Sequence, residues 1–491
     1  MTSLPRSQRV RDPLHNLIEF GSDDFESVVW RVIQTRPFQR LRRIRQLGFS
    51  ELVYPGATHT RFAHSIGVFQ NARRLTQIIK ARFRETGRQY ESHWARVALV
   101  ASLLHDLGHG MFSHAFEEVG KELKRKSNLD LKMVKHEHVT DVLIRHREVS
   151  EILNQAFGSG FANDVADLIG RGYPKRIYDS VVSSQFDADR LDYMQRDRLM
   201  TGVQNSGIDL TWLLANMETG TVQASVDEEN IGEIETFALG PKAAHAAETY
   251  ILGLFQLYPT VYFHKATRGA ETLFTALMVR LMTLVRDGSA ERTGLPNNHP
   301  FVRFAIGPEQ LDNALLLDDT VFWGALSSLA EAADPLIGNY ALRLRDRHLL
   351  KCVDIRERLL AKLPAPPPSA DTESRKKHAA LLARLSDRIK LEISDWNGEK
   401  FTNLPRILID QAHRSPYKRF QDSDTPLNQI HIRIEDDKIL DVAERSAVVA
   451  ALEPFELFRV YVDRHDDECV KKIGLIIDGS IENEGKDDGQ A

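Results

Sequence analysis

Four side chains that could do chemistry directly follow an apolar segment of the chain. In LLHDLGHGMFSH, residues 103–114, His105, Asp106, His109 and His114 come after the apolar run 97–104. Imidazole and carboxylate groups bind divalent metals and transfer protons in enzymes. They are unfavourable to bury unless they are paired or bound to a metal. The segment is therefore a predicted functional site.

Asp106 lies near the end of the predicted helix, because Gly108 and Gly110 follow and glycine is common just past a helix terminus. A carboxylate there faces the negative end of the helix dipole, which is unfavourable by up to about 1 kcal/mol. A bound divalent cation would compensate this charge. Taken alone, however, a His-Asp pair is more often a structural cap beside a buried histidine.

Two further segments offer similar groups. THTRFAHSIGVF places Arg61 and His64 at the start of an amphipathic helix, and FDADRLDYMQRD supplies several aspartates. Cys352 and Cys469 are the only cysteines in the sequence, so a metal would have to be held by histidine and carboxylate. The alternative for the aspartate-rich segment is an ordinary solvated helix face.

Six motifs together resemble one enzyme family. They are DPLHNLIEF, TRPFQRLRRIRQLG, YPGATHTRFAHSIG, LLHDLGHGMFSHAFE, HEHVTDVLI and FDADRLDYMQRDRLMTG, in this order. The chain resembles the HD-domain deoxynucleoside triphosphate (dNTP) triphosphohydrolases, in the branch of the vertebrate SAM-and-HD-domain enzyme and its bacterial relatives. The similarity extends from about residue 10 to about residue 470 and is weakest around the proline-rich segment.

The resemblance implies a divalent metal, Mn, Fe, Mg or Zn, held by His64, His105, Asp106 and Asp189. Asp189 is preferred to Asp187 because its spacing of four and eight residues places it on one helical face with Tyr193 and Asp197, as in the family. The resemblance implies that Tyr193 and Asp197 bind the substrate. The same family pattern places a set of cations and donors near the phosphates: Arg61, His109, His114, His136, Arg190 and Lys265.

The resemblance also suggests roles in proton transfer and sugar binding. His136 or His114 is the predicted general acid, and Glu117 is predicted to orient His114. Any one of these histidines alone would be an ordinary surface or core residue. Four side chains are predicted to contact the substrate's sugar, the last two closing the space of a 2′-hydroxyl: Gln46, Leu47, Asp197 and Tyr262. Simple core packing is the alternative for Tyr262.

Gln39 and Arg42 match positions that bind a nucleotide effector in the family. Gln34 replaces the acidic residue that reads the guanine edge, which argues against GTP as activator. Leu254 stands where the vertebrate enzyme has an arginine facing the triphosphate, which favours a different substrate. Ordinary ion pairs on a helix face are the alternative for the segment RLRRIR.

The elements that must position these groups are mainly helical. Apolar residues recur at helical spacing over most of residues 24–360, so we predict a helical HD core over 1–360. A Pro-rich loop and linking helix are expected over 361–399, and a small α/β subdomain over 400–478. Alternating residues in QIHIRIEDDKI, ELFRVYVD and KKIGLIID predict its strands, and 479–491 reads as a disordered tail.

Composition narrows the class of protein. The chain has 491 residues and a net charge of −5, which argues against a surface that binds nucleic acid everywhere, although local basic clusters stay open. No apolar run is long enough to span a bilayer, and no signal peptide is evident. A cytoplasmic location is expected, and the resemblance implies a homo-oligomer, dimer or tetramer.

Three functions remain at this stage. The first is a metal-dependent dNTP triphosphohydrolase that releases a deoxynucleoside and triphosphate. The second is an HD phosphohydrolase acting on another phosphoester, such as a nucleoside monophosphate, a cyclic nucleotide or a nucleic-acid end. The third is a nucleotide- or nucleic-acid-binding regulator in which the metal site is structural or sensory.

Overall fold

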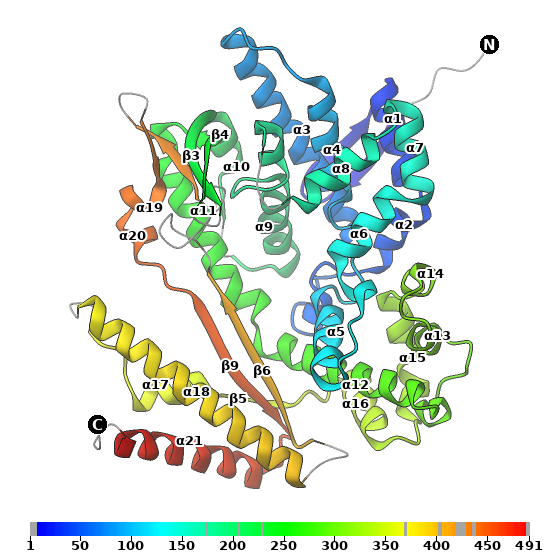
Figure 1. The fold of residues 1–491 in the computed structure, drawn as a ribbon, viewed down its shortest axis with the longest axis vertical. Helices are drawn as coiled ribbons and strands as arrows, with labels where there is room; N and C mark the ends of the chain where they lie inside the picture. The colour runs from blue at the N-terminus through cyan, green and yellow to red at the C-terminus, as the bar shows by residue number, and fades with distance from the viewer. Residues whose placement is uncertain are drawn as a thin grey trace. The chain divides into compact units, whose positions relative to one another are not determined.

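The computed structural model describes residues 7–171, 175–204, 207–226, 229–367, 371–400, 405–415, 417, 429–434 and 438–487. The chain forms two compact units, each assembled from three segments. The first unit contains Met1–Tyr262, Asn298–Gly324 and Ser415–Glu453, and the second contains Phe263–Asn297, Ala325–Arg414 and Pro454–Ala491. Helices dominate (Figure 1), which confirms the predicted mainly α fold with a small α/β region. The predicted domain boundaries stay predictions.

Three helices of the first unit carry the predicted metal ligands: α3 (Arg61–Glu85), α4 (Ser92–Leu104) and α9 (Ala188–Thr201). α3 packs against both of the others. The approach to α9 is so close that a Cβ atom on Gly67 would collide with the carboxylate of Asp192. α9 begins where the side chain of Asp187 accepts a hydrogen bond of 2.7 Å from the backbone N–H of Arg190.

The other helices of the first unit surround this core. They are α1 (Asp24–Ile33), α2 (Arg36–Arg40), α5 (His114–Ser127), α6 (His136–Arg145), α7 (Arg147–Phe157), α8 (Phe161–Gly170), α10 (Leu210–Ala215), α11 (Ala244–Leu257), α13 (Pro300–Ile306), α14 (Leu311–Ala314), α19 (Val442–Arg445) and α20 (Ala447–Ala450). The helix α15 (Asp319–Ala330) spans the division between the units.

Two sheets belong to the first unit. A hairpin joins β1 (Gln8–Asp12) and β2 (Asn16–Phe20). The second sheet has the order β3 (Met217–Val226), β4 (Glu229–Leu239), β7 (His431–Arg433) and β8 (Ile439–Asp441), with only the β4–β7 pair parallel. The strands β3 and β4 were not predicted from the sequence. It did predict strands within residues 429–439, and their turn lies outside the described residues.

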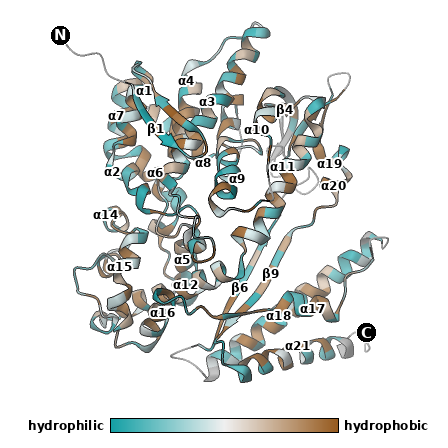
Figure 2. Cartoon of the chain, turned by 180° about the vertical axis from the view of Figure 1, so that it is seen from behind, coloured by the Kyte–Doolittle hydropathy of each residue, from teal (hydrophilic) through white to brown (hydrophobic). Residues whose placement is uncertain are grey.

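The second unit has one antiparallel sheet in the order β5 (Lys351–Asp354), β9 (Phe455–Val462) and β6 (Ile407–Arg414). Its helices are α12 (Lys265–Arg286), α16 (Pro335–Arg345), α17 (Ile355–Lys362), α18 (Thr372–Lys400) and α21 (Asp467–Asp487). Hydrophobic and hydrophilic residues alternate along α18 and α21 (Figure 2), as expected for helices with one buried face. The strand predicted at ELFRVYVD is confirmed as β9.

The strand predicted at KKIGLIID, residues 471–478, is wrong because this segment belongs to α21. Cys469, Ile473, Ile476 and Ile477 are buried together, and their spacing of four, seven and eight residues follows the helical period. The predicted disordered tail is corrected as well, since α21 continues to Asp487. Within the described part of the chain, no helix has the length and apolar character that crossing a membrane requires.

Candidate active site

His64, His105 and Asp189 meet in the first unit. One ligand atom from each lies within 4.8 Å of the other two. The Oδ1 atom of Asp189 is 3.0 Å from His64 Nε2 and 3.6 Å from His105 Nε2. His64 comes from the first turn of α3, His105 follows the last residue of α4, and Asp189 lies in the first turn of α9. Three helices thus aim one ligand atom each at the same point.

The donor set fits a divalent cation. His64 Nδ1 is 2.9 Å from Asp192 Oδ2, and His105 Nδ1 is 2.9 Å from the carbonyl oxygen of Ser102, so each Nδ1–H donates away from the cluster. Both Nε2 atoms are buried and lack a well-formed hydrogen bond within the described residues. Two nitrogen lone pairs therefore face one carboxylate, and a cation between them removes the repulsion.

Without a cation, a proton on the Nε2 atom of His64 removes this repulsion. Burial opposes a charge on His64, but its contacts with Asp189 and Asp192 outweigh burial and raise the pKa of His64 to about 10. Burial would likewise raise the pKa of Asp189, but both histidines lower it. A metal must displace the proton, so metal binding is coupled to pH.

Asp106 lies beside this cluster and turns toward Arg61. Its Oδ2 atom accepts a hydrogen bond from the Arg61 guanidinium and is 3.7 Å from His64 Nε2. Its Oδ1 atom is 3.4 Å from His105 Nε2 and 3.2 Å from His109 Nε2. Burial would raise the pKa of Asp106, but Arg61 and the two histidines hold it well below its usual value. Asp106 is thus an ionised group at the edge of the candidate metal site.

A second cluster contains His109, His114, His136 and Glu117, with His109 joined to it by ring contacts. The rings of His109 and His136 stack with centroids 4.0 Å apart. Glu117 contacts His136 Nδ1 through one carboxylate oxygen, and the other lies 3.2 Å from His114 Nδ1. Burial opposes the charge of Glu117, but these histidines hold its pKa far below the usual value. Burial, together with Arg61 and His136, keeps the pKa of His109 well below its usual value, so His109 is neutral.

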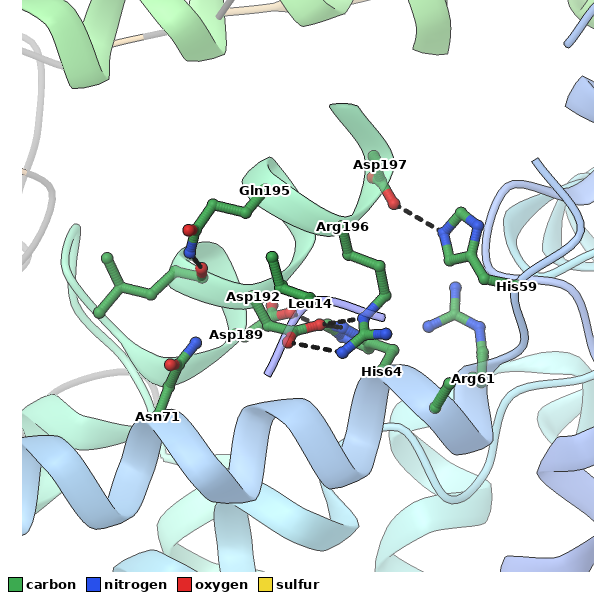
Figure 3. A network of polar contacts seen from close by, with 12 residues as sticks. Leu14, His59, Arg61, His64, Asn71, Asp189, Asp192, Gln195, Arg196 and Asp197 are labelled. Carbon is green, nitrogen blue, oxygen red and sulfur yellow. Dashed lines mark hydrogen bonds and ion pairs between the residues drawn. The ribbon is translucent and has the colours of Figure 1, made fainter. Parts of the chain in front are cut away.

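A buried ionic network lies behind His64 (Figure 3). Asp192 accepts from Arg196 Nε at 2.7 Å, and its other oxygen is 2.7 Å from His15 Nε2. Arg196 also donates to Asp12 at 2.8 Å. By fixing the Nδ1–H of His64, Asp192 directs the Nε2 atom of His64 toward His105 and Asp189. None of these four residues was assigned a role from the sequence, although DPLHN and the aspartate at position 192 belong to the motifs that carry the resemblance.

The side chains predicted to contact the sugar form another chain of contacts. Tyr262 donates to Asp197 Oδ2 at 2.8 Å, and His59 Nε2 is 2.8 Å from Asp197 Oδ1. The rings of Tyr193 and Tyr262 meet edge to face at 6.3 Å. Gln46 joins them through its backbone N–H, which donates to the carbonyl of His59 at 3.1 Å. His59 was given no role, although it lies within the motif THTRFAHSIGVF quoted for Arg61 and His64.

The other predicted substrate residues are placed differently. Arg190 donates to Asp187 and to the carbonyl oxygen of Ser184. Leu47 directly precedes a 3₁₀ turn, η2 (Gly48–Leu52), and is partly buried. Lys265 begins α12 in the second unit and is described with that unit.

The two predicted effector residues contact each other. Arg42 Nε donates to Gln39 Oε1 at 2.8 Å, and the Arg42 guanidinium lies 3.5 Å from the centre of the Phe62 ring. Gln39 also donates to the carbonyl oxygen of Ile33 at 2.8 Å. In this arrangement the two side chains hold each other in place.

Comparison with known proteins identifies the family. The HD domain profile matches residues 61–194, which include the two histidine clusters and the first half of α9. The uncharacterized protein YwfO of Bacillus subtilis (strain 168) is 33% identical over 346 residues, covering 70% of this chain and 71% of the relative. The chain belongs to the HD superfamily of phosphohydrolases. This membership supports a metal-dependent hydrolase, since HD domains bind divalent metals.

Two further proteins resemble this chain, one over part of its sequence and one in its fold. Bovine deoxynucleoside triphosphate triphosphohydrolase SAMHD1 is 33% identical over 219 residues, covering 40% of this chain and 36% of the bovine protein. A phosphohydrolase structure from Bacteroides thetaiotaomicron VPI-5482 aligns with a TM-score of 0.66 at 23% identity, covering 94% of this chain and all of that one. The structural match shows that the fold is shared.

Proposed function

We propose that this HD protein is a metal-dependent dNTP triphosphohydrolase. Water attacks the α-phosphorus, the bond between that phosphorus and the 5′ oxygen breaks, and the 5′ oxygen takes a proton. The products are a deoxynucleoside and inorganic triphosphate. The relatives named as SAMHD1 support this choice of substrate, and so does the contact of Tyr262 with Asp197 at the expected sugar side.

The position of Asp106 between the two clusters carries the proposal. One of its oxygens lies 3.4 Å from His105 and 3.2 Å from His109. A phosphoryl group at the metal ligands is therefore within reach of the imidazoles of the second cluster. His64, His105, Asp106 and Asp189 would hold the metal, which supplies Lewis-acid polarisation and charge neutralisation when bound.

The second cluster would supply the proton. His136 or His114 donates it to the leaving 5′ oxygen, and Glu117 fixes the Nδ1 side of both rings so that each Nε2 is the transferring atom. His109 stacks on His136 and limits its orientation. Arg61 and Arg190 add positive charge near the phosphates, and Lys265 is proposed to do the same.

One observation favours a second candidate function. Leu254 on α11 is buried and apolar where the resemblance expects an arginine that faces the triphosphate. A protein without this cation suits a substrate with fewer phosphate charges, such as a nucleoside monophosphate or a cyclic nucleotide. The metal site and the general acid would keep their roles for either substrate.

Product analysis separates the candidates. The purified chain is incubated with Mn²⁺ or Mg²⁺ and each dNTP, singly and mixed, beside nucleoside monophosphates, cyclic nucleotides and single-stranded DNA. We expect deoxynucleoside and triphosphate from dNTPs, absent with Asp106→Ala, and turnover only in mixtures would point to an effector site. Turnover of another phosphoester alone would favour the second candidate. No turnover at all, with nucleotide binding kept by Asp106→Ala, would favour a regulator.

A further inference from the structure

The loop of residues 53–60, between η2 and α3, carries a buried histidine that belongs to neither cluster. His59 is 6% exposed, and its Nε2 atom lies 2.8 Å from Asp197 Oδ1 (Figure 3). Its Nδ1 atom is buried and has no hydrogen-bond partner within the described residues. A buried nitrogen without a partner is unfavourable, and an apolar side chain would avoid this cost. The contact with Asp197 is therefore what a histidine supplies at this position.

Asp197 is the middle member of a chain of hydrogen bonds. Its side chain is 2% exposed, and each of its two oxygens has a partner. Oδ1 faces His59, and Oδ2 accepts from the hydroxyl of Tyr262 at 2.8 Å. Burial and the charge of Asp197 raise the pKa of Tyr262 well above its usual value, so the hydroxyl keeps its proton at neutral pH. Two donors, the Nε2–H of His59 and the O–H of Tyr262, thus hold one carboxylate between them.

Tyr262 is the end of this chain that solvent reaches. It is partly exposed, whereas His59 and Asp197 are buried. It ends the π-helical turn η6 (Tyr258–Tyr262), and its ring meets that of Tyr193 edge to face. A sugar on the expected side of the site would meet Tyr262 and not the imidazole of His59. Any influence of His59 on a substrate must therefore pass through other side chains.

His59 is also tied to Gln46, on which the sugar was expected to lie as well. The backbone N–H of Gln46 donates to the carbonyl oxygen of His59 at 3.1 Å. A second bond of 2.9 Å, from the N–H of Arg61 to the carbonyl oxygen of Ile44, completes a short antiparallel bridge. His59 thus contacts Gln46 through its backbone and Asp197 through its side chain.

The loop itself is anchored to the elements that carry Asp197 and Tyr262. The hydroxyl of Tyr54 donates to the carbonyl oxygen of Thr260 in η6. At Gly56 the backbone approaches α9 so closely that a Cβ atom would lie 2.7 Å from the carbonyl oxygen of Met200. The backbone that holds the imidazole of His59 is therefore fixed relative to both α9 and η6.

We propose that His59 is a positioning residue that determines the discrimination between deoxyribose and ribose. The inference rests on the proposed function, in which Asp197 and Tyr262 close the space of a 2′-hydroxyl. The Nε2–H of His59 keeps the carboxylate of Asp197 in one orientation, and the carboxylate keeps the ring of Tyr262 in place by its hydroxyl. Without the imidazole, Asp197 is free to turn and Tyr262 follows it, so a ribonucleotide is accepted more readily.

Substrate discrimination in variants of His59 tests the proposal. The measured quantity is the ratio of kcat/KM for a dNTP to that for the ribonucleotide with the same base. We expect His59→Leu to lower this ratio about tenfold with metal content unchanged. His59→Gln should restore most of it, because the glutamine amide nitrogen is as many bonds from Cβ as Nε2 of histidine. His93→Leu is the matched control, since His93 pairs with Asp164 at 2.8 Å outside the site, and should keep the ratio.

A double variant shows whether His59 acts through Asp197. Asp197→Ala should lower the same ratio, and adding His59→Leu to it should cause no further loss. Independent, additive losses would contradict the proposed chain of contacts. If His59→Leu does not fold, His59→Asn takes its place, because its amide is one bond shorter than that of glutamine and should lose the discrimination that His59→Gln keeps.

Binding separates this proposal from the proposed function. The Kd values of dATP and ATP are measured by calorimetry in a metal chelator, where turnover stops. A wild type that hydrolyses no dNTP but prefers dATP, with the preference lost in His59→Leu, would refute the proposed function and keep the role of His59. An unchanged ratio in His59→Leu, an equal loss in His59→Gln, or a wild type that does not prefer deoxyribose in rate or in affinity would overturn the proposal.

Discussion

The two histidine clusters of the first unit use the same kinds of side chain and differ in which ring nitrogen is held. In the cluster of His64, His105 and Asp189, the Nδ1 atoms are tied to Asp192 and to a backbone carbonyl, and the Nε2 atoms converge. In the other cluster, a single carboxylate, Glu117, holds two rings.

One exposed imidazole also distinguishes the second cluster, although its His109 is buried like His64. The side chain of His64 is fully buried, whereas that of His114 is 73% exposed. A buried, convergent set of nitrogens suits a resident cation, and an exposed imidazole suits exchange of protons with solvent and substrate. Both groups satisfy a simple distance criterion for metal binding. Hydrogen bonding behind each ring, more than the distances alone, therefore distinguishes their roles.

The largest expected effect comes from removing a convergent nitrogen. His105→Ala should lose the metal and lower kcat by on the order of 10³-fold, because the metal loses one of the two imidazole nitrogens that converge on it. His114→Ala is the matched control in the second cluster and should keep its metal. Metal content by mass spectrometry and initial rates check both. Full metal content in His105→Ala would contradict the assignment of the metal to the cluster of His64, His105 and Asp189.

A smaller loss is expected from the second cluster. Glu117→Gln keeps the shape of the side chain and removes the charge that holds His114 and His136, so kcat should fall by about 10²-fold with metal content unchanged. Steady-state kinetics with metal analysis measures this. A variant that loses metal instead would show that the second cluster also holds the cation.

Asp192, which supports His64, is expected to influence the affinity for the metal. Asp192→Asn leaves the Nδ1–H of His64 with a weaker acceptor, so metal affinity should fall about 10- to 100-fold. Competition with a fluorescent chelator gives the affinity. Asp187→Asn, a change at a neighbouring aspartate outside the cluster, is the control, and equal metal affinities in the two variants would contradict the supporting role of Asp192.

The last effect is on stability and concerns the turn between the clusters, which Asp319 holds through the N–H of Phe112. Burial raises the pKa of Asp319 to about 7, while it is near 4 in the unfolded chain. The folded state thus keeps a proton that the unfolded state releases, and this group's contribution to stability falls as pH rises from about 4 to 7, by at most about 4 kcal/mol.

Asp319→Asn removes this titration. Relative to the wild type, its free energy of unfolding should therefore improve as pH rises over the same interval. Urea unfolding of both proteins at several pH values measures the difference. A difference that does not change with pH would show that Asp319 is ionised throughout.

Much of the site could be predicted because motifs fix residue types at fixed positions on helices. The segments around His64, His105 and Asp189 contain their own helix starts and ends, and the structure brings the three side chains together. The network of Asp192 with His15 and Arg196 was missed because it joins residues far apart in the chain, and no local pattern shows such a pairing.

The errors in the fold have a similar origin. The segment 471–478 contains both an alternating and a helical apolar pattern, and packing against α18 selects the helix. The strand β7 was found from its alternation, but its parallel pairing with β4 depends on two segments about 200 residues apart. Arg40 was read as one of several basic residues, since burial of a guanidinium is invisible in the sequence.

Hydrolysis of a dNTP in ¹⁸O-labelled water tests the central claim most directly. Mass spectrometry of both products shows which atom the water attacks. We predict one ¹⁸O atom in the triphosphate and none in the deoxynucleoside, because the bond that breaks joins the α-phosphorus to the 5′ oxygen. Label in inorganic phosphate or pyrophosphate, with a nucleotide as the other product, would contradict the account and place the reaction at another phosphorus.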